Sequence, residues 1–183
     1  MGDMASSPLI RTLLESAESL PWRMQDLGLM GLRLDDRREF RLHVWDPSRF
    51  EEELPIHDHP YSFTSTVIAG ELANTRYVED DHGDEYVRFR YSPGAEVQRR
   101  SDAVRLSAAS TTFKEGERYA QLAHELHSSS QLPGTVTLIR CSWLASSELT
   151  VCFRDKESWT SGVGRDATPE EIRSFAAKAL EWF

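Results

Sequence analysis

Residues 55–72 read PIHDHPYSFTSTVIAGEL and combine a candidate metal motif with the pattern of a strand pair. On an extended strand, residues i and i+2 point to the same face, so His57 and His59 can bind one ion together. The following residues lead to Gly70, and glycine accepts the positive φ that a tight turn between strands requires. The stretch therefore predicts two strands joined at a turn, with two candidate metal ligands beside them.

The rest of the middle of the chain also alternates with a period of two residues. Between 40 and 45, Phe40, Leu42 and Val44 alternate with Arg41, His43 and Trp45. Turn residues such as those at 81–84 separate the alternating segments. Many short strands at this spacing predict an all-β antiparallel sandwich or barrel. Further strands are expected at 64–69, 72–78, 86–91, 103–108, 119–122, 135–141 and 149–153.

The two ends of the chain are predicted to be helices. Ser7 and Pro8 supply an N-cap and a proline at the first helical position, and an apolar i, i+3, i+4 pattern follows until Pro21. Thr168 and Pro169 repeat this start signal near the C-terminus. We expect one domain over 1–183, with an N-terminal helix at about 8–19, a barrel at about 29–154 and a C-terminal helix at about 169–182.

Composition limits the class of protein. Of the 183 residues, 39% are hydrophobic, which disfavours intrinsic disorder, and the net charge of −9 disfavours nucleic-acid binding. Neither a membrane-spanning run nor a secretory signal is visible. Cys141 and Cys152 have no C-x-x-C spacing and lie in strand-like surroundings, so we expect reduced, buried thiols. These features favour a cytoplasmic monomer or homodimer that acts on a small molecule, without nucleic-acid or membrane partners.

A third histidine ligand can come from the segment His124-Glu125-Leu126-His127. Its spacing differs from the helical H-E-x-x-H motif of zinc proteases. On a strand, residues three apart point to opposite faces, so only one of the two histidines is expected to face an ion. Spacing alone leaves His124 and His127 as alternatives.

The chain resembles the cupin superfamily over about half of its length. Residues 55–72 are similar to the first cupin motif, in which H-x-H is followed by a turn glycine, and residues 116–127 are similar to the second, which ends in the last ligand. The resemblance implies a jelly-roll barrel with flanking helices and favours His127 over His124. Phe63 and Thr64 stand where many cupins have a glutamate ligand, so the implied ligands are His57, His59 and His127. Fe(II) is the expected metal, with Zn, Ni, Cu or Mn as alternatives.

A three-histidine site further resembles the cysteine dioxygenase-like cupins, which are thiol dioxygenases. That resemblance implies an arginine that binds the substrate carboxylate, for which Arg33 and Arg41 are the candidates. Tyr61 and Tyr119, near the metal motifs, are the candidate catalytic acids or bases. The family's serine-histidine-tyrosine relay is missing, because Thr137, Ile139 and Cys141 occupy the corresponding strand. A thiol dioxygenase proper is therefore disfavoured.

The function expected from these residues is that of a mononuclear Fe(II) dioxygenase or other oxygenase. Its substrates would be dioxygen and a small molecule derived from a carboxylic acid or an amino acid. The alternatives are a metal-dependent lyase or isomerase on the same three histidines, and a cupin that binds a small molecule without turnover. The fold alone does not choose among them, because one scaffold supports many reactions.

Overall fold

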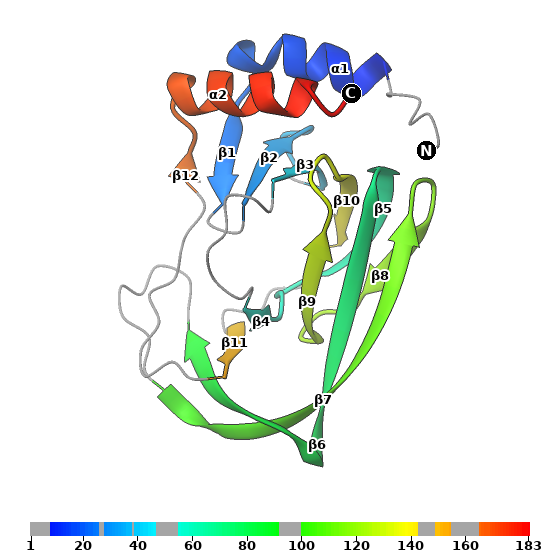
Figure 1. Cartoon of the computed structure of the whole chain (residues 1–183). Helices are drawn as coiled ribbons and strands as arrows, with labels where there is room; N and C mark the ends of the chain where they lie inside the picture. The colour runs from blue at the N-terminus through cyan, green and yellow to red at the C-terminus, as the bar shows by residue number, and fades with distance from the viewer. Residues whose placement is uncertain are drawn as a thin grey trace.

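The computed structural model describes residues 8–25, 28–37, 39–46, 55–91, 100–142, 149–154 and 165–183 (Figure 1). Two helices, a short 3-10 helix and twelve strands make up this part of the chain. The helical elements are α1 (Pro8–Glu15), η1 (Ala17–Ser19) and α2 (Pro169–Leu180). The strands are β1 (Trp22–Gln25), β2 (Leu29–Arg33), β3 (Phe40–Trp45), β4 (Ile56–His57), β5 (Ser62–Ala69), β6 (Glu71–Tyr91), β7 (Arg100–Lys114), β8 (Arg118–Gln121), β9 (Leu126–Gln131), β10 (Val136–Ser142), β11 (Leu149–Phe153) and β12 (Arg165–Asp166).

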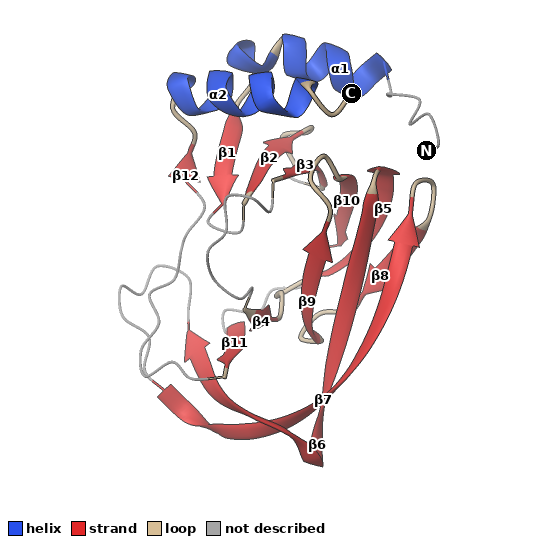
Figure 2. Cartoon of the chain, in the orientation of Figure 1, coloured by secondary structure: helices blue, strands red, loops and turns tan. Residues whose placement is uncertain are grey.

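The strands form two antiparallel sheets, so the prediction of an all-β fold is confirmed at this level (Figure 2). One sheet has the order β12-β1-β2-β3-β10-β5-β8, and the other has the order β11-β4-β9-β6-β7. The larger sheet includes β1 and β12, which lie outside the barrel range of 29–154 expected from the sequence. Gly70 joins β5 to β6 with a φ of 80°, as the turn expected there requires.

The helices cover the outer face of the larger sheet, and Figure 1 shows them side by side over β1 and β2. Ile10 of α1 and Phe175 of α2 are at most 2% exposed and share one core with Leu42 and Val44 of β3. The apolar face of β3 therefore looks towards the helices. The alternate residues of β3 look towards the other sheet, and they form part of the site described below.

The predicted start of α2 is confirmed in detail. Thr168 Oγ1 accepts a hydrogen bond from the backbone N–H of Glu171, and the Glu171 carboxylate accepts one from the N–H of Thr168. This reciprocal capping box satisfies two backbone donors that have no partner inside the helix. At the other end of the chain, the helix expected at 8–19 is divided into α1 and η1. The proposed cap Ser7 lies outside the described residues.

The turn expected at 81–84 is wrong. β6 continues through this segment, and its pairing with β7 shifts register there, so that Glu79 and Asp84 both have Leu106 as their partner. The residues between them form a bulge, in which a Cβ on Gly83 would lie 2.4 Å from the Leu106 carbonyl carbon. Acidic residues and glycine occur in bulges as well as in turns, which explains why this stretch of sequence predicted a turn.

Two further expectations concern the cysteines and membranes. Cys141 and Cys152 are free and buried, as predicted, and burial raises the pKa of the Cys152 thiol to about 12. Neither α1 nor α2, nor any other described helix, has the length and apolar character needed to cross a bilayer.

Candidate metal centre

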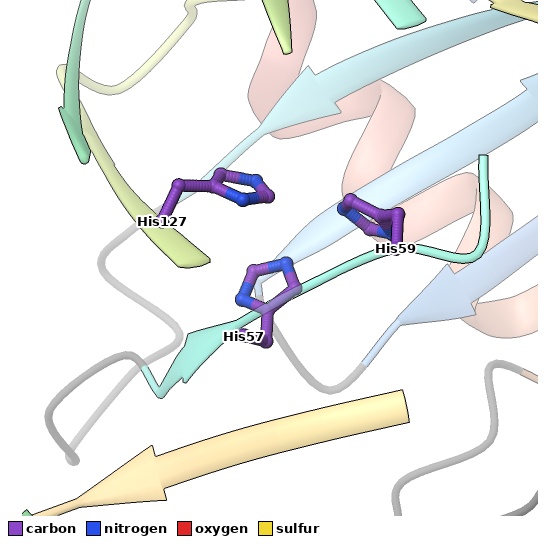
Figure 3. Close-up of side chains that lie close together, drawn as sticks. All are labelled: His57, His59 and His127. Atoms are coloured by element: carbon purple, nitrogen blue, oxygen red, sulfur yellow. The ribbon is translucent and has the colours of Figure 1, made fainter. Parts of the chain in front are cut away.

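Three histidines converge on one point of the smaller sheet, as Figure 3 shows. His57 comes from β4, His127 from β9, and His59 from the segment that follows β4. One ligand nitrogen from each ring lies within 4.8 Å of the nitrogens of the other two. The ring centroids are 4.6 Å apart for His57–His127, 4.9 Å for His57–His59 and 5.1 Å for His59–His127. The three side chains could therefore hold one metal ion.

Strand pairing brings these distant residues together. His57 and His127 are direct partners in the β4–β9 pairing, so their side chains leave adjacent strands on the same face. Nδ1 of His57 lies 3.0 Å from the carbonyl oxygen of Pro55, and Nδ1 of His127 lies 3.4 Å from that of Glu125. A ring that donates from Nδ1 to a carbonyl keeps Nε2 unprotonated for a metal and is fixed in orientation.

Burial keeps all three rings in the neutral form that binds metals. Desolvation is the main cause that lowers each pKa, to about 3 for His127, below the ordinary value for His57 and well below it for His59. The neighbouring histidines lower the pKa of His59 and His127 further. Metal binding at neutral pH therefore does not have to displace protons from these rings.

His124 lies outside this cluster. It has a φ of 62° in the turn before β9, its side chain is about half exposed, and its Nδ1 lies 3.4 Å from Oδ2 of Asp58. Asp58 points away from the cluster, because it stands between His57 and His59 in extended backbone. Its Oδ1 accepts a hydrogen bond of 2.7 Å from the Thr150 backbone N–H. His124 and Asp58 thus contact each other on the side of residues 57–59 that faces away from the three histidines, and Asp58 holds this segment against Thr150.

The three histidines form part of the wall of a cavity between the two sheets. The space free of protein atoms there amounts to about 650 Å³, a figure that includes the part open to solvent. Most of the surface that the wall exposes is apolar, although polar and charged side chains also contribute to it. The residues that line it are Gln25, Leu29, Arg41, His43, Trp45, His57, His59, Tyr61, Phe63, Tyr119, His127, Ser129, Thr137 and Ile139.

Of the two arginines predicted to bind substrate, Arg41 lines this cavity. Its Nη1 donates a hydrogen bond of 2.9 Å to the Tyr61 hydroxyl, and its guanidinium carbon lies 5.2 Å from the centroid of the Tyr61 ring. Arg33 is the partner of Arg41 in the β2–β3 pairing, and it lines an adjacent opening that Arg41, His59 and Tyr61 also line. The structure therefore places Arg41 in the wall of the histidine cavity and Arg33 in the opening next to it.

Both tyrosines predicted to be catalytic lie in the cavity wall. The Tyr61 ring is stacked on His59 with centroids 5.2 Å apart, and burial raises the pKa of its phenol despite the nearby Arg41 charge. Tyr119 is stacked on Phe113 at 4.8 Å, and burial raises its pKa as well. Both phenols therefore stay protonated at neutral pH and can donate a hydrogen bond.

Phe63, which the cupin resemblance aligns with a glutamate ligand, places an apolar ring beside the histidines. Phe63 meets His59 edge-on, with ring centroids 5.3 Å apart, and it lies 5.8 Å from the His127 ring. On β10, Thr137 and Ile139 line the cavity, and Thr137 Oγ1 accepts a hydrogen bond of 3.2 Å from Trp45 Nε1. Cys141 is not among the cavity-lining residues and packs in the apolar cluster that includes Phe63.

His43 is a cavity residue to which the sequence assigned no role. Its ring meets Trp45 edge-on at 5.9 Å, and burial, aided by the Arg41 charge, lowers its pKa to about 3. The alternation within 40–45 does not show by itself whether this side chain faces solvent or a cavity. His43 alternates with Leu42 and Val44, so it points to the opposite face of β3. Because the helices cover Leu42 and Val44, that opposite face is the one towards the cavity.

Compared with known proteins, the chain matches no family model and no curated protein.

Proposed function

We propose that the protein is a metal-dependent cupin enzyme, a mononuclear non-heme Fe(II) oxygenase that acts on a small substrate derived from a carboxylic acid or an amino acid. The observation that supports this most strongly is the cluster of His57, His59 and His127 in the wall of a largely apolar cavity. A divalent metal bound by three imidazoles would supply a Lewis-acidic centre with open positions for a substrate and dioxygen.

The chain's own residues would bind and orient the substrate. Arg41 brings a permanent positive charge to the cavity, where it can bind a carboxylate. The Tyr61 hydroxyl accepts a hydrogen bond from Arg41 and keeps its own proton to donate to a bound group. Phe63 and Ile139 present apolar surface on the remaining wall and exclude water from the reacting molecule.

Oxygen consumption by iron-loaded protein tests the proposal. A panel of small carboxylic and amino acids is added under air, and dissolved oxygen and products are measured. We expect at least one acid to cause oxygen uptake together with product formation, and His59→Ala protein to show neither. Product formed in the strict absence of dioxygen would instead identify a lyase or isomerase, and tight binding without any product would identify a binding protein.

Free cysteine is expected to be a poor substrate. Ile139 and Cys141 stand on β10 where thiol dioxygenases have a histidine and a tyrosine, and an isoleucine can neither orient nor protonate a reactant. Iron-loaded protein incubated with cysteine under oxygen should form little sulfinate. Rapid sulfinate formation would contradict this alignment and would make a thiol dioxygenase the correct interpretation.

A further inference from the structure

β7 leaves a row of backbone groups unpaired along one edge of the smaller sheet. It is the last strand of that sheet, and within the described residues it pairs only with β6. Figure 1 shows it beside β6, on the side away from β9. An antiparallel strand bonds its neighbour through every second residue and turns the N–H and C=O groups of the others to the opposite side. Half of the residues of β7 therefore offer both groups to a further strand.

The pairing of β6 decides which residues of β7 these are. Glu71 is the partner of Lys114, and the register stays the same as far as Leu106. The Glu71 carbonyl oxygen accepts a hydrogen bond from the Leu132 N–H, so Glu71 bonds on the β9 side and not to β7. The Lys114 N–H agrees with this, because it donates to the Glu117 carboxylate and not to β6. In steps of two residues from Lys114, the outward residues are Thr112, Ser110, Ala108 and Leu106.

This edge lacks the features that protect exposed sheet edges. Native proteins keep such edges short, cover them, or place charges and prolines on them. The other sheet ends are short or paired: β12 has two residues, β8 has four, and β11 pairs with both β4 and β6. From Leu106 to Phe113, β7 contains neither a charged residue nor a proline, and residues 108–112 are exposed. No described element forms a backbone hydrogen bond with the outward groups of these residues.

A second copy of the same strand fits this edge. Two antiparallel strands related by a two-fold axis pair in this way when outward residues lie opposite outward residues. With the axis at Ser110, Ala108 lies opposite Thr112 of the second copy. The same register places Arg105 opposite Glu115 of the second copy, so opposite charges meet at both ends of the contact. The strand is neutral between these ends, so the net charge of −9 is not concentrated where the copies meet.

The neighbouring registers fit less well. An axis midway between two residues would bring outward residues opposite residues that already bond β6, which the geometry of the pair excludes. An axis at Ala109 would place Arg105 opposite Phe113 of the second copy, without a charge pair. An axis at Ala108 would extend the contact beyond Leu106, where the pairing of β7 with β6 shifts register. These comparisons favour the register described above.

We propose that the protein is a homodimer in which the β7 strands of two copies pair antiparallel about a two-fold axis at Ser110. The two five-stranded sheets then become one continuous sheet. Ser110 pairs with its own copy, and Ala108 pairs with Thr112 twice. Three such pairs of two bonds each give about six backbone hydrogen bonds, which is within the range of about 5–15 found in protein interfaces. Because the contact uses the free edge of each smaller sheet, association stops at two copies.

A cysteine on the two-fold axis tests the pairing. In Ser110→Cys the two thiols would face each other, since residues in such a pair have Cα atoms about 5.5 Å apart, within the reach of a disulfide. Ala108→Cys is the matched control, because it is exposed on the same face of the same strand but would lie about 14 Å from its copy. We expect mild oxidation to link Ser110→Cys into a dimer on non-reducing gels and to leave Ala108→Cys unlinked. The native Cys141 and Cys152 are buried and do not interfere.

Sedimentation of the unlinked protein tests the dimer in solution. Over about a hundredfold range of concentration, the wild type should approach twice the 20.9 kDa of one chain. Ser110→Pro removes an outward N–H and leaves the bonds to β6 in place, so it should weaken the dimer at least about tenfold. Ser110→Ala keeps that N–H and should dimerise like the wild type. Circular dichroism establishes that each variant is folded; if Ser110→Pro does not fold, the two cysteine variants decide.

Three results would overturn the pairing. The first is a wild type that stays monomeric over the whole range of concentration. The second is equal linking of Ser110→Cys and Ala108→Cys, or linking of Ala108→Cys alone, which would contradict the register. The third is an unchanged dimer in folded Ser110→Pro, which would place the contact on another surface.

Discussion

Replacing Asp58 with alanine tests whether this buried side chain holds the backbone of residues 57–59 in place. The Asp58 side chain is almost fully buried, accepts the Thr150 N–H at 2.7 Å and lies 3.4 Å from His124. Alanine leaves the Thr150 donor without its acceptor, at a cost of about 1–3 kcal/mol, and the half-exposed contact with His124 adds less than about 1 kcal/mol. We therefore expect a loss of about 1–4 kcal/mol, or about 2–16 °C in Tm for a chain of this size.

The same substitution should also weaken metal binding. Asp58 fixes the backbone between His57 and His59, and groups that orient metal ligands from behind are typically worth about 10–100-fold in affinity. Thermal unfolding of metal-free protein measures the first effect, and calorimetry with zinc measures the second. Asp58→Asn is the matched control, because its amide oxygen still accepts from Thr150, so both changes should be small. Unchanged Tm and unchanged zinc affinity in Asp58→Ala would refute this reasoning.

Two further predictions concern the cap of α2 and two glycines with positive φ. The Arg165 side chain and the cap lower the pKa of Glu171 from 4.5 to about 2, so its contribution to stability is present above about pH 4.5 and lost as the pH falls to about 2. Glu171→Gln should therefore lower Tm at pH 7, and thermal melts of variant and wild type should converge towards pH 2; a constant difference would contradict this. Gly134→Ala should destabilise more than Gly116→Ala in urea unfolding: both have positive φ, which costs about 1–2 kcal/mol, but only at Gly134 would the Cβ meet another side chain, 2.8 Å from Trp182 Cβ. Equal losses would show that Trp182 moves aside without cost.

The strands were predictable from alternation, but the direction of their faces was not. Phe40–Trp45 is a strand with the predicted bounds, and Leu42 and Val44 share one face as expected. Because the helices cover one face of the sheet and the other sheet covers the opposite one, both faces of β3 are shielded. Alternation with a period of two residues does not show which of two covered faces contains the cavity. The sequence therefore did not predict that His43 lines it.

The candidate ligands were predictable to different extents. His57 and His59 followed from spacing alone, because neighbours two apart share a face in extended backbone. His127 required the cupin resemblance, since His124 lies only three residues away. In the structure His124 lies in a turn with a positive φ, whereas His127 lies on β9. A pattern of two residues does not reveal such a turn. The course of β6 through 81–84 was missed for a similar reason, because the pairing partner β7 rather than local sequence decides between bulge and turn.

The most direct test of the account is the metal content of four histidine variants. Wild-type protein loaded with Fe(II) under anaerobic conditions, dialysed and analysed by mass spectrometry should retain one ion per chain. His57→Ala, His59→Ala and His127→Ala should each lose most of it while keeping the far-ultraviolet spectrum of the wild type, and His124→Ala should retain it. Stoichiometric metal in all three ligand variants, or loss of metal in His124→Ala alone, would contradict the three-histidine centre.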